Sequence, residues 1–204
     1  MGAVVHWFEN LADSFANAIY VTLIQEDQYK QLLRGLGKSL ELTAIAAVIG
    51  VILGLLLAIA KLQDVDNLTG NPVVIWIRKM VAGFANGYIS VIRGTPAVVQ
   101  LMVIYFILYL RVLNKLPLFS GVSDVVIASI AFGINSSAYV AEIIRAGILA
   151  VDKGQTEAAR SLGLSGGASM RFVVLPQAIK NVLPALANEI VTMVKESSIC
   201  SMLG

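Results

Sequence analysis

The sequence predicts an all-α protein with several membrane-spanning helices. Of its 204 residues, 57% are hydrophobic and 14% are charged, and the mean hydropathy is +0.80. A soluble domain of this composition would lack the polar surface needed to cover its own core. Residues 42–60 contain no charged side chain, and a helix of that length just crosses a hydrocarbon layer of about 30 Å. The chain is therefore expected to form a helix bundle in a bilayer.

Residues 1–38 are predicted to form an amphipathic segment outside the membrane core. Glu9 and Asp13 stand where a secretory signal would carry basic residues, and no apolar run follows them. Hydrophobic side chains recur instead at helical spacing, namely Trp7, Phe8, Leu11, Phe15, Ile19 and Leu23. Such a helix suits a membrane surface or a partner protein, and packing on the chain's own bundle is an equal alternative.

The transmembrane domain is predicted over residues 39–204. Its helices are expected at about 40–61, 74–111, 124–146 and 177–199. The second should bend at Pro96, because proline removes a backbone donor from a helix. The fourth contains Pro184 and several charged residues, among them Glu189 and Lys195. Neighbouring helices should therefore shield it from lipid.

Small residues at four-residue spacing mark two of these helices. They are Ala46, Gly50, Gly54 and Ala58 in the first helix, and Ser129, Gly133, Ser137 and Ala141 in the third. Small faces let helix backbones approach closely, which is how helices associate in lipid. The stripes predict a compact bundle with a second copy or a related chain against it, and ordinary packing within one chain is the alternative.

The distribution of Lys and Arg predicts the orientation, because the inner loops of membrane proteins are enriched in both. With the N-terminus outside, the inner regions hold Lys61, Arg78, Lys79, Arg145, Lys153, Arg160, Arg171 and Lys180. The outer regions hold Lys30, Arg34, Lys38, Arg111 and Lys115. This bias of eight against five places residues 145–180 in the cytoplasm.

Residues 152–176, between the third and fourth helices, predict a loop of two short helices. Thr156 can cap the first helix, and Gly163 suits the left-handed residue that ends it. A second short helix is expected over residues 168–174, ending before Pro176. Glycine and alanine leave a smooth surface on which another protein can sit closely.

The sequence predicts no catalytic residue, cofactor or metal site. Ser165 lies in a G-x-S-x-G pattern, but a nucleophile elbow needs a preceding strand and a histidine base. The only histidine is His6, in the N-terminal segment, so Ser165 is interpreted as a turn residue. No phosphate-binding loop occurs in the sequence, so the chain is not expected to hydrolyse ATP itself. The net charge of +2 does not indicate a nucleic acid partner.

The loop resembles the EAA loop of permease subunits of bacterial ATP-binding cassette importers. The family pattern is Glu-Ala-Ala, three residues, Gly, nine residues, Ile, any residue and Leu-Pro. At those spacings this chain has Glu157, Ala158, Ala159, Gly163, Val173, Leu175 and Pro176, with valine in place of isoleucine. Other segments resemble the polar amino-acid branch of the family: RGTP at Arg93 to Pro96, NSSAYVAEIIRAGI from Asn135, and KESSI from Lys195, where Asp is expected instead of Glu196.

The resemblance covers residue 36 to the end and implies a bacterial inner-membrane permease of the type I importer fold. It implies two cytoplasmic ATPase subunits that bind ATP and Mg²⁺, a second permease subunit that is identical or related, an external solute-binding protein, and a polar amino acid as the solute. The residues implied in ATPase coupling are Glu157, Ala158, Ala159, Arg160, Gly163, Leu175 and Pro176. Family members usually continue into a further transmembrane helix, so the last one is expected to be absent here.

Polar side chains inside the predicted helices are candidates for the solute path. They are Gln100, Asn135, Ser136, Ser137, Asn188 and Glu189, although packing between helices is the commoner role of such groups. Glu189 stands out because its carboxylate could meet the ammonium group or a cationic side chain of an amino acid. Arg93 and Glu142 are predicted to pair, because an unpaired charge at this depth is costly. Extension of both side chains to water is the alternative.

Two other functions are compatible with an apolar helix bundle. An ion-coupled secondary transporter would need ionisable relays inside the membrane and internal repeats, and the sequence shows neither convincingly. A membrane assembly or scaffold protein would explain the small-residue stripes but not the pattern of the loop.

Overall fold

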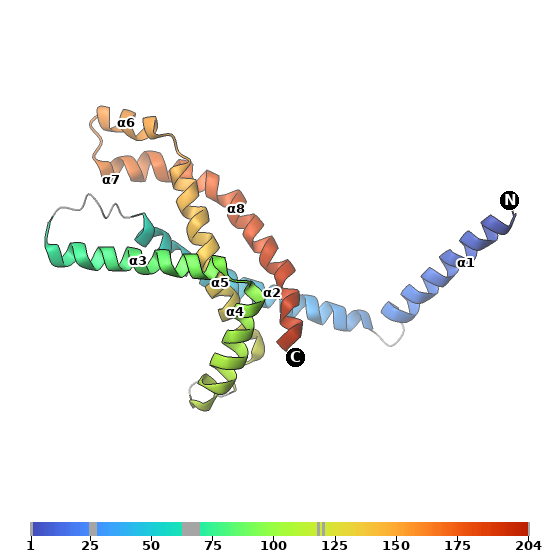
Figure 1. Cartoon of the computed structure of the whole chain (residues 1–204). Coiled ribbons are helices and arrows are strands. Elements are labelled where there is room, and N and C mark those ends of the chain that lie inside the picture. Colours follow the sequence, from blue (N-terminus) through green and yellow to red (C-terminus); the bar gives the residue numbers. More distant parts are fainter. Residues whose placement is uncertain (1, 25–27, 63–69, 118, 120, 204) are drawn as a thin grey trace. The chain divides into compact units, whose positions relative to one another are not determined.

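A computed structural model describes residues 2–24, 28–62, 70–117, 119 and 121–203 of the chain. Every regular element in these ranges is helical, as the sequence predicts. The chain divides into two compact units, residues 1–41 and 42–204, so the division falls after Glu41 rather than after Lys38. Figure 1 shows the order of the elements by colour.

The first unit contains α1 (Gly2–Ile19), a π-helical turn (Tyr20–Ile24) and the first turns of α2. The predicted apolar stripe of α1 lies on the surface of this unit, with Trp7 59% and Phe15 69% exposed. The rings of Trp7 and Phe8 meet edge to face, with centroids 5.0 Å apart. The side chain of Leu23 lies outside the described part of the chain. Contact of this stripe with a membrane or a partner stays a prediction.

Helix α2 (Gln28–Lys61) begins well before the expected residue 40. Residues 28–41 are rich in Leu, Lys and Arg and contain no proline, and these residue types favour a helix whether or not they lie in lipid. The apolar run therefore marked only the membrane part of a longer helix. At 1.5 Å per residue, its 34 residues extend over about 51 Å, which exceeds the hydrocarbon thickness of a bilayer.

The expected single helix over residues 74–111 is wrong, because the chain leaves the helical conformation at Thr95 and Pro96. Helix α3 (Pro72–Gly94) ends there, and α4 (Ala97–Met102) continues as a π-helical segment (Val103–Tyr109). Thr95 is extended, with φ −123° and ψ 146°, as the residue before a proline prefers. Two helices with different directions therefore replace one bent helix (Figure 1).

Helix α5 (Asp124–Leu149) is the most buried element of the second unit. The small-residue stripe of α2 faces that of α5: a Cβ placed on Gly54 would lie 2.7 Å from Cβ of Val140, and one placed on Gly133 would lie 2.7 Å from Cβ of Ile49. Residue numbers rise together along this contact, so the two helices run parallel. The two stripes thus pack against each other within one chain. This is the alternative to packing against a second copy or a related chain.

Helix α8 (Leu175–Glu196) packs on another face of α5 and runs antiparallel to it. Ser136 of α5 bonds to Glu189 near the end of α8, whereas Gly147 accepts a hydrogen bond from Asn181 near its beginning. Close packing at Gly147 brings the side chain of Val182 against the α5 backbone. The helix expected over residues 177–199 begins two residues earlier, at Leu175, and ends at Glu196. A 3-10 segment (Ser197–Leu203) follows it.

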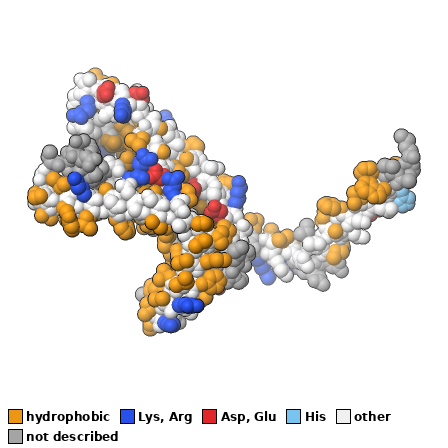
Figure 2. Space-filling view, in the orientation of Figure 1, with side chains coloured by type: hydrophobic (Ala, Val, Ile, Leu, Met, Phe, Trp, Pro, Cys, Tyr) orange, Lys and Arg blue, Asp and Glu red, His pale blue; other side chains and the backbone are white. Residues whose placement is uncertain are grey.

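Within the described ranges, three helical stretches are long and apolar enough to cross a membrane. They are Gln28–Lys61, Ala97–Lys115 and Asp124–Leu149, and they overlap the first three helices predicted from the sequence. Figure 2 shows hydrophobic side chains over most of the visible surface of α4 and the π-helical segment after it. In that segment Val103, Phe106 and Ile107 are exposed. Such a surface suits contact with lipid.

Candidate functional site

The first arm of the predicted loop is α6 (Lys153–Ser161). Asp152 caps this helix, because its side chain accepts a hydrogen bond from the backbone N–H of Gly154 at 2.6 Å. Thr156 lies inside the helix, so the expectation that it caps α6 is wrong. The cap stands only three residues after the end of α5, so α6 begins as soon as the chain has turned.

The residues of α6 that match the EAA pattern lie on two sides of the helix. Ala159 is buried, with 4% of its surface exposed, and α6 packs there on the helical segment that follows the turn. Glu157, Ala158 and Arg160 are exposed. The buried alanine holds the arm in place, and the other three residues are available to a partner protein.

The turn between the arms forms at Gly163, whose φ of 88° is readily adopted only by glycine. The N–H of Gly163 bonds to the carbonyl of Arg160, and the N–H of Leu164 to that of Ala159, which closes the helix end. Ser165 then caps the next helix by accepting the N–H of Ala168 at 3.3 Å. Ser165 is thus a cap residue at a turn, in agreement with its interpretation from the sequence.

The second arm is continuous with α8. Helix α7 (Gly166–Ser169) passes into a π-helical segment (Met170–Val174), which passes directly into α8. The expected stop before Pro176 is wrong: the N–H of Leu175 bonds to the carbonyl of Met170, and this wider turn lets the helix pass through a proline that has no N–H. Leu175 and Pro176 are therefore the first two residues of α8.

Exposed apolar side chains gather on this loop, and sequence reasoning missed them. Leu162, at the end of α6, is 86% exposed, and Phe172 of the second arm is 65% exposed. The sequence held a signal for both, because neither side chain lies in an apolar run that a membrane would cover. Large apolar side chains at the tip of a structured loop are typical of protein interfaces.

Three consecutive residues of α5 each contact a different helix. Asn135 donates to Oε1 of Gln100 in α4 at 2.9 Å, and Ser136 donates to Oε1 of Glu189 in α8 at 3.0 Å. Ser137 lies 2.9 Å from the hydroxyl of Tyr88 in α3. Successive residues of a helix point about 100° apart, so three in a row can reach three neighbours. The NSS run is therefore the polar centre of the bundle.

Gln100 closes the break between α3 and α4. Its side-chain nitrogen donates to the carbonyl of Ile92 at 2.7 Å and to Oγ1 of Thr95 at 2.5 Å. These bonds satisfy backbone and side-chain groups that the end of α3 leaves free. Together with its contact to Asn135, they indicate a structural role for Gln100 in this state of the protein.

Only two of the six path candidates line a described pocket. Ser136 and Glu189 lie at the edge of a cavity of about 260 Å³ between α2, α5 and α8, with apolar neighbours that include Ala47, Val140 and Met193. Asn188 is exposed and is not part of the lining. Gln100, Asn135 and Ser137 are engaged at other contacts of α5. The Ser136–Glu189 pair is therefore the polar feature of this cavity.

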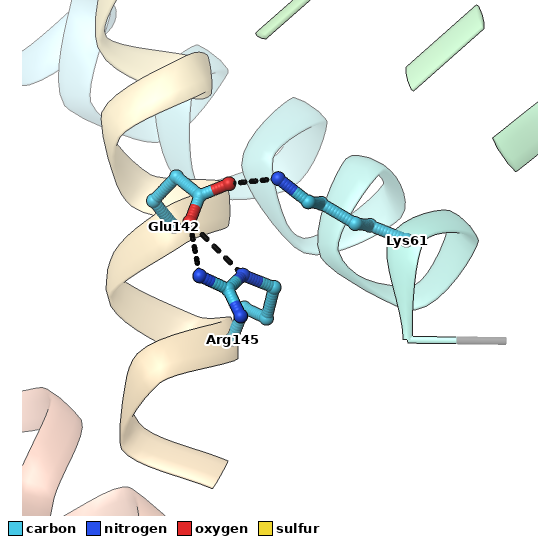
Figure 3. A network of polar contacts seen from close by, with 3 residues as sticks. All are labelled: Lys61, Glu142 and Arg145. Carbon is cyan, nitrogen blue, oxygen red and sulfur yellow. Dashed lines mark hydrogen bonds and ion pairs between the residues drawn. The ribbon is translucent and has the colours of Figure 1, made fainter. Parts of the chain in front are cut away.

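The predicted pair of Arg93 and Glu142 is wrong. Glu142 instead contacts Lys61, the last residue of α2, and Arg145, which lies one turn further along α5 (Figure 3). Nε of Arg145 donates to Oε2 of Glu142 at 2.9 Å. The guanidinium of Arg93 lies 5.4 Å from the ring centre of Tyr139, a cation–π contact. The contact between Glu142 and Arg145 could have been predicted from the sequence, because residues three apart are neighbours on a helix.

A membrane-spanning helix bundle with an internal polar centre and an exposed two-helix loop is an arrangement expected of a membrane transport protein. The chain is a member of the family of binding-protein-dependent transport system inner membrane components, whose sequence model matches residues 50–204. It is thus a membrane-spanning permease of the ATP-binding cassette transporter class. This membership sets aside the ion-coupled transporter and the assembly protein.

Individual relatives agree with the family. The chain is 43% identical over 175 residues to the arginine transport system permease protein ArtQ of Bacillus subtilis, which covers 85% of this chain and 70% of the relative. It is 42% identical over 166 residues to the putative glutamine transport system permease protein GlnP of Rickettsia felis, covering 81% and 67%. A crystal structure of an amino acid ABC transporter with histidines superposes with a TM-score of 0.70 at 46% identity, covering 87% of this chain and 74% of that one.

Proposed function

We propose that this chain forms the translocation pathway of an ATP-driven importer of polar amino acids. In this scheme two copies of a separate ATPase subunit bind ATP and Mg²⁺, and a second permease subunit, identical or related, completes the pathway. An external solute-binding protein delivers the amino acid, and the chain itself performs no covalent chemistry. The proposal is supported by the family and by the arginine and glutamine systems in the names of the relatives.

The observation that carries the coupling role is the structure of residues 153–174. The loop is exposed at Glu157, Arg160 and Leu162, it is joined to α5 through residues 150–152, and it continues into α8 without a break. Because α5 and α8 pack on each other and hold the polar centre, a protein that moves the loop would move both helices. ATP-driven closure of the ATPase pair would thus bias the bundle between its inward-open and outward-open states.

Co-purification tests this role. The tagged chain should hold the ATPase subunit of its own genome in detergent, whereas a variant with Glu157→Lys and Gly163→Pro should lose it while remaining monodisperse. Proline cannot adopt the φ of 88° seen at Gly163 because its ring fixes φ near −65°, so the turn between the arms would break. Equal ATPase recovery from both forms would contradict the proposed docking loop.

The proposal places the N-terminus outside and the loop in the cytoplasm, and the single cysteine makes this measurable. In a Cys200→Ser background, Ser161→Cys should react with a membrane-impermeant thiol reagent only in inside-out vesicles. Ser123→Cys, just before α5, should react only in right-side-out vesicles or cells. Both serines are exposed in the structure. Labelling of the two positions from the same side would contradict this orientation.

The cavity beside Glu189 suits a small zwitterionic or cationic solute, because a carboxylate in an apolar setting attracts an ammonium group. Replacement Glu189→Gln keeps the size and the bond to Ser136 but removes the charge. Uptake of a cationic amino acid in proteoliposomes should fall about 10- to 100-fold, since a hydrogen bond to a charged group contributes about 1.5–3 kcal/mol. Glu196→Gln, two turns further along α8, is the matched control. Unchanged rate and solute range in the Glu189 variant would remove this residue from the path.

A further inference from the structure

The second unit contains an ion-pair network that the proposed function does not use. Glu142 is bonded to Lys61 through one carboxylate oxygen and to Arg145 through the other. The side chains are 14%, 23% and 32% exposed for Glu142, Lys61 and Arg145. Figure 3 shows Lys61 reaching from the end of α2 across to α5. The network therefore joins two helices at one end of their parallel contact.

The position of this contact matters because α2 does not adjoin the loop in the sequence. Helix α5 leads into α6 through three residues, and α8 is continuous with α7. Helix α2 is reached only through its packing on neighbouring helices. Along most of its contact with α5, this packing consists of small and apolar side chains, such as Gly54 against Val140. Such surfaces fix a distance between helices but resist sliding less than a directional ion pair does.

We propose that the contact between Lys61 and Glu142 locks the inner end of α2 to α5, so that α2 moves with the loop and ATP hydrolysis stays coupled to solute movement. This inference rests on the proposed function. Both residues are positioning residues, since neither lines the cavity that contains Ser136 and Glu189. Motion entering at α6 passes along α5 to Glu142, and through Lys61 to α2. Elements that move as packed units transmit such shifts.

The network allows the lock to be opened without leaving a bare charge. Replacement Lys61→Met keeps most of the length and the apolar character of the side-chain stem, and Glu142 still has Arg145 as a partner at 2.8 Å. The large penalty of an uncompensated buried charge is thereby avoided. Lys61→Met should thus yield a folded permease in which α2 is no longer tied to α5 at this end.

The test uses the complete transporter, with its ATPase and solute-binding protein, in proteoliposomes. ATP hydrolysed per amino acid imported should rise about fivefold in Lys61→Met, within the range of typical coupling energies, while ATPase recovery on purification stays at the wild-type level. Lys61→Arg should keep the wild-type ratio. Lys79→Met, which removes an exposed lysine of α3, is the matched control and should also keep it.

A double-variant comparison assigns the effect to the contact. Glu142→Gln should raise the ratio, and adding Lys61→Met should raise it no further, because both changes remove the same interaction. Additive increases of the ratio in the double variant would overturn the proposal. Equal losses of ATP hydrolysis and uptake in Lys61→Met would also overturn it, because they indicate a contribution to stability alone. A wild-type complex without ATP-dependent uptake would overturn the proposed function together with this inference, whereas wild-type uptake with an unchanged ratio in Lys61→Met overturns the inference alone.

Discussion

Replacement Leu162→Asp is expected to abolish ATP-dependent uptake while leaving the permease folded. Leu162 is 86% exposed at the end of α6, so the change removes no contact within the chain. Full burial of a leucine side chain contributes about 1.5–3 kcal/mol, and a buried aspartate adds a desolvation cost. We expect the affinity for the ATPase to fall by a factor of about 30 or more.

The measurement is ATPase recovery with the tagged permease, followed by uptake in proteoliposomes. Leu116→Asp is the matched control, because it makes the same change at an exposed leucine that precedes α5, on the predicted outer side. That variant should retain the ATPase. Loss of the ATPase in both variants would indicate general instability, and wild-type recovery with Leu162→Asp would show that the tip of the loop is not the docking surface.

Replacement Gly133→Leu is expected to prevent assembly of the bundle. A Cβ on Gly133 would lie 2.7 Å from Cβ of Ile49 and 3.2 Å from the carbonyl oxygen of Ala46. The α2 backbone cannot give way locally, so α2 and α5 would have to separate along their whole contact. Overpacking by one or two methylene groups typically costs about 1–3 kcal/mol, and leucine adds more than that. We expect loss of the monodisperse peak in detergent and strong proteolytic sensitivity.

Gly133→Ala should give a smaller change of the same sign, measured as a lower melting temperature in detergent. Gly83→Ala in α3 is the matched control, because no atom lies within 4 Å of a Cβ placed there. Since alanine favours a helix over glycine by about 1 kcal/mol, Gly83→Ala should leave the melting temperature unchanged or raise it. A stable, monodisperse Gly133→Leu protein would contradict the close packing of α2 and α5.

The sequence predicted the helical class and the apolar spans because both depend on composition and on runs of residues. It also predicted the turn at Gly163, since a left-handed residue after a short helix strongly favours glycine. One error of the sequence-based prediction concerns a choice between two nearby residues that suit the same role. Asp152 and Thr156 can both cap a helix, and only the place where α5 ends decides between them.

The ion pairs of Glu142 show that contacts between distant segments are equally hard to predict from the sequence. From the predicted spans, Arg93, Lys61 and Arg145 are all expected at about the same membrane depth as Glu142. Depth alone therefore does not decide which of them pairs with Glu142. The parallel packing of α2 on α5 selects Lys61, and helical spacing selects Arg145. Exposed Leu162 and Phe172 were missed although neither lies in an apolar run that a membrane would cover, because a sequence rich in apolar residues does not show which of them are exposed.

The parallel packing of α2 and α5 also determines whether the chain between them crosses the membrane an odd or an even number of times. Two spanning helices that run in the same direction begin on the same face of the bilayer, so the chain between them crosses an odd number of times. Among the described residues of that connection, only Ala97–Lys115 has the length and hydropathy of a span. One return crossing by Ala97–Lys115 then satisfies this requirement.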